Sequence, residues 1–449
     1  MGKLFGTDGI RGEANKYPMD AKMAFSVGQA LTRVLKEEGL EGNVVVGKDT
    51  RISGYMLEGA LEAGITSMGG SVQITGVLPT PGIAYITESM RADAGIVISA
   101  SHNPFQDNGL KIFSGDGYKL SDEEEARIEE LILDNELESM VPHPREMGRA
   151  RRLIDAIGRY VVFLKSTFPR ELSMHGFKVV LDVANGATYQ VAPAVFRELG
   201  AELLVIHDEP DGFNINDNCG SQHTQDLRVK VLETGAQLGL AFDGDGDRLI
   251  AVDEHGQEIT GDQILMICAN QLKKEGRLAN DLLVTTVMSN LGLRIACEEA
   301  GFHHHASKVG DRYVLEDMKR LGAVIGGEDS GHMIFLDRHT TGDGIVAALQ
   351  LVAAMLRSGL PLSKLATQMD VYPQKLINVD VTSKPPVESL PELVEAIARV
   401  EEELHGKGRV LVRYSGTQNM CRVMVEGPTV ESTERYAAEV ADIVRRLIG

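Results

Sequence analysis

Short apolar segments, typical of buried strands, alternate with helical segments along most of this chain. The first three strand segments begin at Val44, Val72 and Ile96, and a helical pattern from Met56 to Gly69 separates the first two. The same alternation returns twice, with strand segments over 178–185, 201–206, 238–242, 282–287, 304–309 and 323–327. Strands that alternate with helices of about 10 to 15 residues indicate crossover connections and largely parallel sheets. The sequence therefore predicts an α/β protein.

Several domains are expected, because a chain of 449 residues exceeds what one hydrophobic core organises. An acidic helical segment over 122–138 precedes a first boundary, and the polar stretch 254–257 and Tyr372-Pro373 indicate two more. The last part has its own strands and a closing amphipathic helix from Thr429, which is typical of a small α+β domain. We predict domains at 1–150, 151–255, 256–370 and 371–449.

The charge of the chain restricts its partners. Its 65 acidic and 45 basic residues give a formal net charge of −20, which argues against nucleic acid as a partner. An anionic substrate would therefore need cations gathered in a local site. No apolar run approaches the roughly 18 residues that span a membrane, and no secretory signal precedes the first glycine-rich motif. Four scattered cysteines indicate reduced thiols in a cytoplasmic protein rather than a zinc site.

A buried strand runs into a polar loop at Gly95 to Pro104, which contains Ser101 and His102. Pro104 and its predecessor cannot continue regular pairing, so the two side chains are expected on a tight loop at the strand's end. In open α/β sheets this carboxyl edge is where ligands bind. Ser101 is thus a candidate nucleophile, and from this segment alone an ordinary Ser/Asn turn is an equal alternative.

Three aspartates alternate with glycines after another predicted strand, at Asp243, Asp245 and Asp247. The glycines let the backbone bend until the carboxylates converge, and converging carboxylates need a cation between them. Oxygen ligands suit Mg²⁺ or Ca²⁺ better than Zn²⁺. An EF-hand loop is a poorer match, because Arg248 stands where its turn needs glycine and a strand precedes it. A solvated acidic turn explains the spacing less well than a metal site does.

Two further loops carry polar groups suited to a sugar phosphate. One contains Glu328, Ser330 and His332 on one side of an extended stretch, where they offer donors and acceptors for hydroxyl groups. The other is a Ser-Gly-Thr turn between Arg413 and Arg422, a combination that can bind phosphate. A glycine-rich surface turn and a strand-connecting hairpin are the respective structural alternatives.

These motifs occur in a recognisable order, beginning with Gly6-Thr-Asp-Gly-Ile-Arg-Gly12. After it come Ser99-Ala-Ser-His-Asn-Pro104, the Asp243–Arg248 stretch, the Gly327–His332 loop and the terminal Arg-x-Ser-Gly-Thr loop. In this set the chain resembles the phosphoglucosamine mutases, a family of the α-D-phosphohexomutase superfamily, over essentially its full length. The resemblance implies four domains around a central cleft, three of them related α/β domains with mixed, largely parallel sheets and the last a smaller α+β domain. A homodimer is compatible with the resemblance.

The resemblance also implies roles for individual residues. Ser101 would be modified to phosphoserine and would hold Mg²⁺ through a phosphoryl oxygen, together with Asp243, Asp245 and Asp247. The reaction centre would further include Arg11, His102, Lys111, Arg248 and His332. Sugar contacts would come from Lys308, Glu328, Asp329 and Ser330. The phosphate that does not react would be bound by Arg413, Ser415, Gly416, Thr417 and Arg422.

By this resemblance the substrate is a small sugar phosphate. Glucosamine 6-phosphate and glucosamine 1-phosphate would interconvert through a hexosamine 1,6-bisphosphate, and the product would supply UDP-N-acetylglucosamine for cell-wall synthesis. Lys111 and His332 are both candidates for the general base; burial or a nearby cation is expected to lower the pKa of Lys111 enough for that role. A hinge near 370–376 would open the last domain.

The chain departs from the family pattern at two places. Asp329 stands where glutamine is usual; it would either pair with the ammonium group of the substrate or face solvent. The Gln418-Asn419 pair replaces Glu-Pro, which would loosen the phosphate loop. The alternatives to the amino-sugar reaction are a phosphomannomutase or phosphoglucomutase of the same superfamily, a metal-dependent serine phosphatase, and a non-catalytic sugar-phosphate or Ca²⁺-binding protein.

Overall fold

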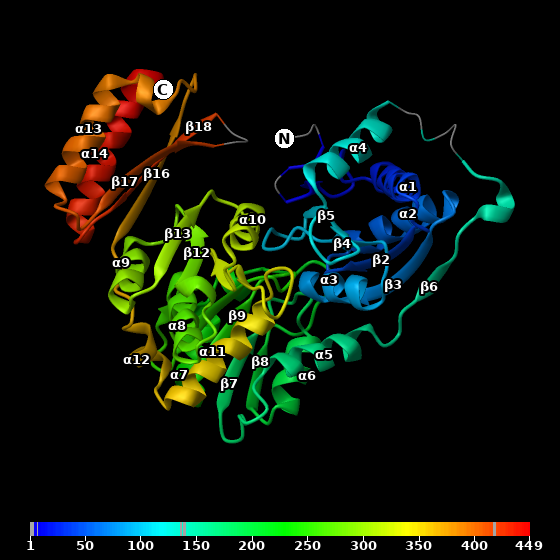
Figure 1. Ribbon diagram of the computed structural model, residues 1–449, viewed down its shortest axis with the longest axis horizontal. Helices are drawn as coiled ribbons and strands as arrows, with labels where there is room; N and C mark the ends of the chain where they lie inside the picture. Colours follow the sequence, from blue (N-terminus) through cyan, green and yellow to red (C-terminus); the bar gives the residue numbers. More distant parts are fainter. Residues whose placement is uncertain (1–3, 7, 135–136, 138–140, 416–418) are drawn as a thin grey trace. The chain divides into compact units, whose positions relative to one another are not determined.

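A computed structural model describes residues 4–6, 8–134, 137, 141–415 and 419–449, and Figure 1 follows the elements along the chain. The chain divides into two compact units, each described by itself below. Unit 1 comprises Met1–Val287 and His305–Thr367, and unit 2 comprises Met288–His304 and Gln368–Gly449. Among the described residues, no helix combines the length and apolar character needed to cross a bilayer.

The first sheet of unit 1 has a parallel centre and an antiparallel edge. Its strands lie in the order β1 (Ile10–Glu13), β5 (Asp107–Ser114), β4 (Ala94–Ile98), β2 (Asn43–Lys48), β3 (Ser71–Val77) and β6 (Ala150–Arg152). Strand β2 runs parallel to β3 and β4, whereas β5 runs antiparallel to β4 and β1. The reversal at β5 places the loop between β4 and β5 at the carboxyl edge of the parallel strands.

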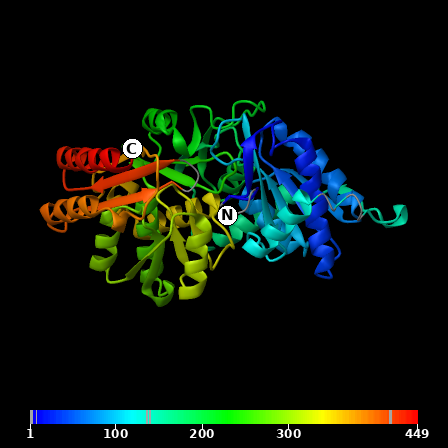
Figure 2. The same ribbon diagram turned by 90° about the horizontal axis from the view of Figure 1, so that it is seen from above.

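Helices cover both faces of this sheet. They are α1 (Ala21–Glu37), α2 (Ser53–Ser67), α3 (Thr80–Ser89) and α4 (Asp122–Leu133). Val44 and Val46 belong to the core that α1, α2 and α4 complete, and Figure 2 shows the dark-blue α1 beside the strands. Gly47 faces the other way, toward α3, where an added Cβ would lie 2.6 Å from the side chain of Ile83. The alternation of side chains along β2 therefore separates the two helical layers.

Local sequence sets where these helices begin. The Asp20 side chain accepts a hydrogen bond from the backbone N–H of Met23 at 2.8 Å, which caps α1. Ser121 and Glu124 form a reciprocal capping box at the start of α4. Such caps satisfy backbone donors that have no partner within the helix.

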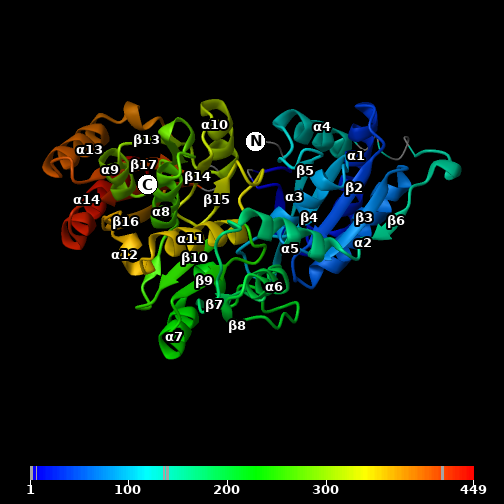
Figure 3. The same cartoon turned by 60° about the horizontal axis from the view of Figure 1, so that its bottom comes forward.

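The second sheet repeats the mixed pattern. Its order is β11 (Glu258–Ile259), β10 (Leu249–Asp253), β9 (Leu238–Phe242), β7 (Lys178–Asp182) and β8 (Glu202–Ile206), with β7 parallel to β8 and β9 and with β10 antiparallel to β9. The accompanying helices are α5 (Ala156–Thr167), α6 (Val191–Glu198) and α7 (Gln225–Thr234). Figure 3 shows α6 and α7 beside these strands. The turn from β9 to β10 contains the three predicted metal ligands.

The third sheet has the order β13 (His303–Ser307), β12 (Leu282–Thr286), β14 (Ile325–Gly327) and β15 (Met333–Phe335). Its helices are α8 (Gly261–Lys274), α10 (Asp311–Leu321), α11 (Gly344–Ser358) and α12 (Leu362–Ala366). The turn from β14 to β15 contains Glu328 to His332. Short 3₁₀ turns lie at Pro144–Glu146, Gly220–Gln222, Ala279–Asp281 and Val387–Ser389.

Unit 2 contains an antiparallel sheet with helices on one face. The strands lie in the order β16 (Gln374–Asp380), β18 (Met420–Glu426) and β17 (Arg409–Tyr414), and Figure 1 shows α13 (Pro391–Glu403) and α14 (Val430–Ile448) side by side against them. Helix α9 (Leu291–Ala300) also belongs to this unit. Thr429 caps α14, so the closing amphipathic helix begins where the sequence predicts it. The predicted α/β class, with mixed, largely parallel sheets and a smaller C-terminal α+β domain, is confirmed.

Candidate active site

Ser101 is buried at the carboxyl edge of the first sheet, three residues after β4 ends. It is 1% exposed and has a φ of 53°, a conformation that non-glycine residues seldom adopt. Its Oγ donates a hydrogen bond to Oδ2 of Asp243 at 2.6 Å and lies 3.4 Å from Nδ1 of His102. The fold thus brings the candidate nucleophile against the aspartate cluster, 142 positions away in the sequence.

The three aspartates converge within a single turn after β9. One ligand oxygen from each of Asp243, Asp245 and Asp247 lies within 4.8 Å of the others, and all three residues are buried. Gly246 has a φ of 75°, and an added Cβ there would lie 2.5 Å from the side chain of Thr188. The turn therefore requires glycine between the second and third aspartates.

The aspartate cluster fits a hard cation. Oδ1 of Asp245 and Oδ1 of Asp247 are buried and have no hydrogen-bond partner among the described residues. Asp245 Oδ2 accepts from Nζ of Lys111 at 2.7 Å and from Oγ1 of Thr80 at 2.6 Å. Orphaned buried carboxylate oxygens are costly unless an ion or proton satisfies them, and oxygen ligands of this kind suit Mg²⁺ or Ca²⁺.

The pKa values of the charged groups in this cluster are shifted by different causes. Burial and the charges of Asp247 and Asp245 hold the pKa of Asp243 well above its ordinary value. Burial alone lowers the pKa of Lys111, but the two carboxylates it contacts raise it overall. Lys111 is therefore held as a cation, which is opposite to the lowering expected from the sequence. The physical reason is that its ion pairs outweigh its desolvation.

Two histidines line this region with opposite protonation tendencies. Burial, reinforced by the charges of Arg248 and Arg11, lowers the pKa of His102 to about 4, so its ring is neutral near pH 7. Burial also lowers the pKa of His332, but Asp247, Asp311 and Glu328 raise it above the ordinary value. The two ring nitrogens of His332 lie 3.7 Å from Asp247 and 3.6 Å from Asp311.

Two arginines turn unsatisfied donors toward the same region. Nε of Arg11 and Nε of Arg248 are both buried without a hydrogen-bond partner among the described residues. Each arginine has one nearby carboxylate, but at more than hydrogen-bond distance. Arg11 Nη2 lies 3.7 Å from Asp8 Oδ2, and Arg248 Nε lies 3.9 Å from Asp247 Oδ1. Buried guanidinium donors without partners indicate a place for an anion such as a phosphoryl group.

The predicted sugar residues are only partly brought together. Glu328 Oε1 accepts from the backbone N–H of Gly310 at 3.0 Å, and Ser330 Oγ lies 3.5 Å from Glu328 Oε2. Asp329 instead accepts from the backbone N–H of Asp262 at 3.2 Å, at the start of α8. Lys308 is exposed, and its Nζ lies 5.5 Å from the ring centroid of Tyr313.

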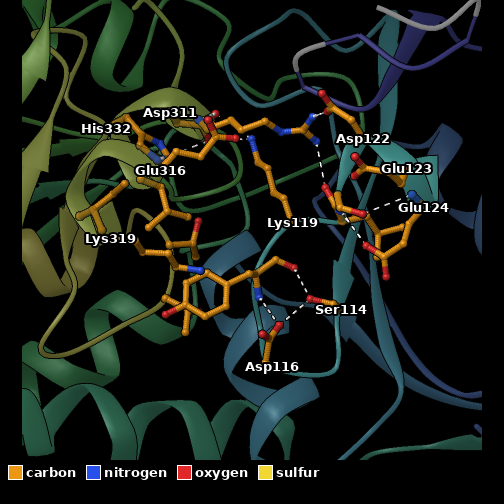
Figure 4. A pocket seen from close by; sticks show the side chains of 18 residues that line it. Ser114, Asp116, Lys119, Asp122, Glu123, Glu124, Asp311, Glu316, Lys319 and His332 are labelled. Atoms are coloured by element: carbon orange, nitrogen blue, oxygen red, sulfur yellow. Dashed lines mark hydrogen bonds and ion pairs between the residues drawn. The ribbon is translucent and has the colours of Figure 1, made fainter. Parts of the chain in front are cut away.

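A pocket of about 220 Å³ joins these groups. Its lining includes Arg11, Ser101, Lys111, Asp247, Arg248, Glu328 and His332, with Asp8 and residues 309–311. A larger cavity of about 490 Å³ adjoins it and shares Asp311 and His332 (Figure 4). Figure 4 shows Lys119 reaching Asp311, and their closest atoms are 2.6 Å apart. The smaller pocket contains the candidate nucleophile, so it is the candidate reaction site.

The predicted phosphate loop belongs to unit 2 and is described by itself. Arg413 and Arg422 are directly opposite each other on β17 and β18. Burial and the charge of Arg422 lower the pKa of Arg413, and Nε of each is buried without a hydrogen-bond partner among the described residues. Ser415 is 4% exposed, and its carbonyl accepts from Lys384 Nζ at 2.8 Å. Two further predicted residues, Gly416 and Thr417, lie outside the described part of the chain.

Several residues of the site were not predicted from the sequence. Thr80 contacts Asp245, and Asp311 lies beside His332. Lys119 pairs with Asp311, and the three residues that were not predicted come from segments far apart in the chain. A further missed residue, Arg51, lies in the run Lys48-Asp-Thr-Arg51 directly after β2. Charged residues just after a buried strand were a usable signal, because β2 ends at the same sheet edge as β4.

Comparison with protein families assigns the whole chain to one architecture. Four phosphoglucomutase/phosphomannomutase profiles match in order: α/β/α domain I over 2–139, domain II over 158–256, domain III over 260–372 and the C-terminal domain over 376–443. Curated phosphoglucosamine mutases from Syntrophobacter fumaroxidans and Syntrophus aciditrophicus are 69% and 62% identical to it. Each alignment covers 449 residues, the full length of both chains.

Solved structures share the fold. A phosphoglucomutase/phosphomannomutase family protein from Burkholderia thailandensis superposes with a TM-score of 0.82 at 25% identity, covering 99% of this chain and 97% of the other. An Aspergillus fumigatus N-acetylphosphoglucosamine mutase, solved in complex with GlcNAc-6P and magnesium, gives a TM-score of 0.70 at 16% identity; the match covers 99% and 95% of the two chains. With full-length relatives this similar, the chain belongs to the phosphoglucosamine mutases, within the phosphoglucomutase/phosphomannomutase superfamily.

Proposed function

We propose that the chain interconverts glucosamine 6-phosphate and glucosamine 1-phosphate, with Ser101 as the phosphoryl carrier. The observation that carries this proposal is the position of the Ser101 hydroxyl, which is buried in the pocket 2.6 Å from Asp243. Full-length relatives named phosphoglucosamine mutase support the amino-sugar substrate. Glucosamine 1-phosphate is a precursor for nucleotide-activated amino sugars, so a nucleotidyl-transfer reaction would consume the product.

The reaction consists of two phosphoryl transfers. Phosphoserine 101 gives its phosphoryl group to the 1-hydroxyl of glucosamine 6-phosphate, which forms the 1,6-bisphosphate and leaves the serine hydroxyl. The bisphosphate then reverses its orientation so that its 6-phosphate faces Ser101, and Ser101 takes the phosphoryl group from the 6-position. Glucosamine 1-phosphate leaves, and the enzyme is phosphorylated again. A trace of the bisphosphate would serve as activator by phosphorylating Ser101 in an enzyme that lacks the group.

Asp243, Asp245 and Asp247 would hold Mg²⁺ beside Ser101. The two orphaned carboxylate oxygens described above are the structural support for this assignment. When bound, the ion would neutralise charge on the transferring phosphoryl group. Arg11 and Arg248 would supply further donors to the same group, and Lys111 would keep the aspartates ionised by pairing with two of them. Phosphoryl transfer depends chiefly on such positioning and charge neutralisation.

His332 is the better candidate for the general base. It lines the pocket with Ser101, and its pKa is raised from the imidazole range near neutral pH, whereas the pKa of Lys111 is raised from the much more basic ammonium range. The His332 ring is therefore the more easily deprotonated of the two and can accept a proton from a sugar hydroxyl. Lys111 is a weaker candidate because the carboxylates of Asp245 and Asp247 raise its pKa. His102 is neutral at pH 7 and lies beside the Ser101 hydroxyl, where it is placed to orient that group rather than to serve the sugar.

The distal phosphate would be bound by Arg413, Ser415, Gly416, Thr417 and Arg422. Two like charges on directly opposite strand positions destabilise a sheet, so an anion between them would be stabilising. Glu328 and Ser330 would contact sugar hydroxyls, and Lys308 would do so only after moving from Tyr313. We assign Asp329 to holding its loop against α8, since its carboxylate accepts a backbone N–H there.

A coupled assay tests this function. Glucosamine 1-phosphate and glucose 1-phosphate are compared with Mg²⁺ and a trace of hexose 1,6-bisphosphate, and free phosphate is followed in parallel. Ser101→Ala should lower isomerisation at least about a thousandfold, since it removes the carrier hydroxyl. Ser166→Ala, which changes an exposed serine on α5 that lines neither pocket, should retain activity.

Each other outcome identifies a different reaction. Faster turnover of glucose 1-phosphate would assign the chain to the hexose branch of the superfamily. Release of free phosphate without isomer would indicate a metal-dependent serine phosphatase. Full activity in Ser101→Ala would contradict the proposed carrier.

A further inference from the structure

Arg51 is a fully buried arginine whose side chain binds the loop that carries Ser101. The residue is 0% exposed. Its Nη2 donates to the carbonyl oxygens of Ser101 at 2.9 Å and Asn103 at 2.7 Å. Its Nη1 donates to the carbonyl of Asp107 at 3.0 Å and also to that of Pro104. One guanidinium thus binds four carbonyl groups, three in the loop after β4 and one at the first residue of β5.

The charge of Arg51 is balanced within the same network. Nε of Arg51 donates to Asp49 Oδ2 at 2.8 Å, and both side chains are completely buried. Asp49 Oδ2 also accepts from Oγ of Ser99 at 2.5 Å, and Ser99 Oγ in turn accepts the backbone N–H of Ser101 at 3.0 Å. The backbone of Ser101 is therefore held on both sides, at its N–H through Ser99 and at its carbonyl through Arg51.

A second side chain clamps the same two carbonyls from the loop after β8. Nδ2 of Asn216 donates to the carbonyl oxygen of Ser101 at 2.9 Å and to that of Asn103 at 3.0 Å. Asn216 has a φ of 58°, a conformation that asparagine tolerates better than most residues. Two donors from separate domains of unit 1 thus meet at one segment of backbone.

This arrangement matters because Ser101 is held in a strained conformation. A φ of 53° is unfavourable for serine and persists only where surrounding contacts enforce it. The conformation aims the Ser101 hydroxyl at Asp243. If the carbonyl contacts were lost, the backbone would relax toward an ordinary conformation and the hydroxyl would turn away from the aspartates.

We propose that Arg51 is a positioning residue for phosphoryl transfer, which locks the backbone of Ser101 so that its hydroxyl faces the aspartate cluster. This inference rests on the proposed role of Ser101 as phosphoryl carrier. Arg51 does not itself line the pocket, and its charge is matched by Asp49, so it acts through the backbone of Ser101 and not on the phosphoryl group. Its loss should impair the transfer step and spare the binding of sugar phosphate.

The test compares Arg51→Lys with Glu58→Gln. Lysine keeps the positive charge but lacks the planar fork that reaches four carbonyls. Glu58→Gln removes another buried ion pair of the same domain, Glu58–Lys48 at 2.7 Å, without touching the loop. We expect kcat of Arg51→Lys to fall about a hundredfold with KM within about threefold of wild type, because small misplacements of reacting groups cost rates of that order. Glu58→Gln should keep kcat within about threefold.

Hydrogen exchange of the amides over 101–107 provides a readout that does not require mutase activity. Arg51→Lys should accelerate this exchange, and Glu58→Gln should not. If the wild type proves inactive as a mutase, the proposed function fails while the exchange data still decide whether Arg51 holds the loop. Should Arg51→Lys not fold, Asn216→Gly removes the second clamp and permits the positive φ; it should also accelerate exchange and lower kcat.

Wild-type exchange and kcat in Arg51→Lys would overturn the proposal. Equal losses of kcat in Arg51→Lys and Glu58→Gln, in step with their unfolding midpoints, would also overturn it, because they would reduce Arg51 to a stabilising residue.

Discussion

Asp343 shows how one buried carboxylate couples the stability of this protein to pH. Its Oδ1 accepts the backbone N–H groups of Ile345 and Val346 at the start of α11, and Tyr160 donates to its Oδ2 at 2.6 Å. Burial nevertheless raises its pKa to about 6. The native protein therefore binds more protons here than the unfolded chain between about pH 4 and pH 6, where an ordinary aspartate is already ionised.

Stability should consequently fall as pH rises through this window. Between pH 5 and pH 8 we expect the free energy of unfolding of wild type to fall by roughly 1.5 kcal/mol relative to that of Asp343→Asn, whose side chain cannot titrate. Denaturant unfolding of unit 1 across this range is the measurement. Asp155→Asn, at the exposed start of α5, is the control and should show a smaller change. A constant difference between wild type and Asp343→Asn would contradict the raised pKa.

At the residue scale, the sequence predicted the groups that carry chemistry better than those that orient them. Ser101 and the three aspartates are recognisable because their residue types and spacing point to a function. Thr80 carries no such pattern, and the position of Arg51 after a strand does not indicate which groups it binds. Their contacts reach across 165 and 50 positions. Lys111 was predicted, but the direction of its pKa shift depends on ion pairs that only the folded chain forms.

At the scale of elements, the proposed phosphate site on the β17–β18 pair should lower the stability of unit 2. The strand register places Arg413 opposite Arg422, which repel each other across the sheet. Arg422→Met should therefore raise the unfolding midpoint of unit 2, by an amount equivalent to about 0.2 to 1 kcal/mol. The same change should raise KM for the sugar phosphate about tenfold or more, since it removes a charge-assisted contact to phosphate.

Calorimetry and steady-state kinetics on the same variant test both effects. Arg409→Met is the matched control on β17, because Arg409 pairs with Glu426 and with the carbonyl of Ser289. That variant should be less stable than wild type with an unchanged KM. A loss of stability in Arg422→Met would mean that the arginines do not repel each other in solution.

At the scale of the whole molecule, we expect substrate to bring the two units closer. The chain passes between them at 287/288, 304/305 and 367/368, and the last of these crossings is close to the hinge predicted near 370–376. Because the proposed carrier is in unit 1 and the phosphate loop in unit 2, binding both ends of one sugar phosphate should close the particle. The radius of gyration from solution scattering should fall on adding glucosamine 1-phosphate.

The scattering experiment has an internal control. Arg422→Met should show a smaller decrease at the same substrate concentration, since it weakens the anchor in unit 2. Identical wild-type curves with and without substrate would rule out closure. The boundaries expected at 150, 255 and 370 stay predictions.

Sequence alone determined the fold class and the order of the motifs, and it predicted several of the side chains that the fold brings together around Ser101. It could do so because strand and helix periodicity are local properties of the sequence. In addition, carboxylates, hydroxyls and arginines indicate by their residue type which chemistry they can perform. The tertiary structure decided the protonation states and the hydrogen-bond partners of these groups. Burial and partners distant in the chain decide that Lys111 is a cation and that the ring of His102 is neutral. They also decide that Asp329 accepts a backbone N–H at the start of α8 and that Arg51 binds the backbone of Ser101. Such partners are chosen by packing, which no local pattern records.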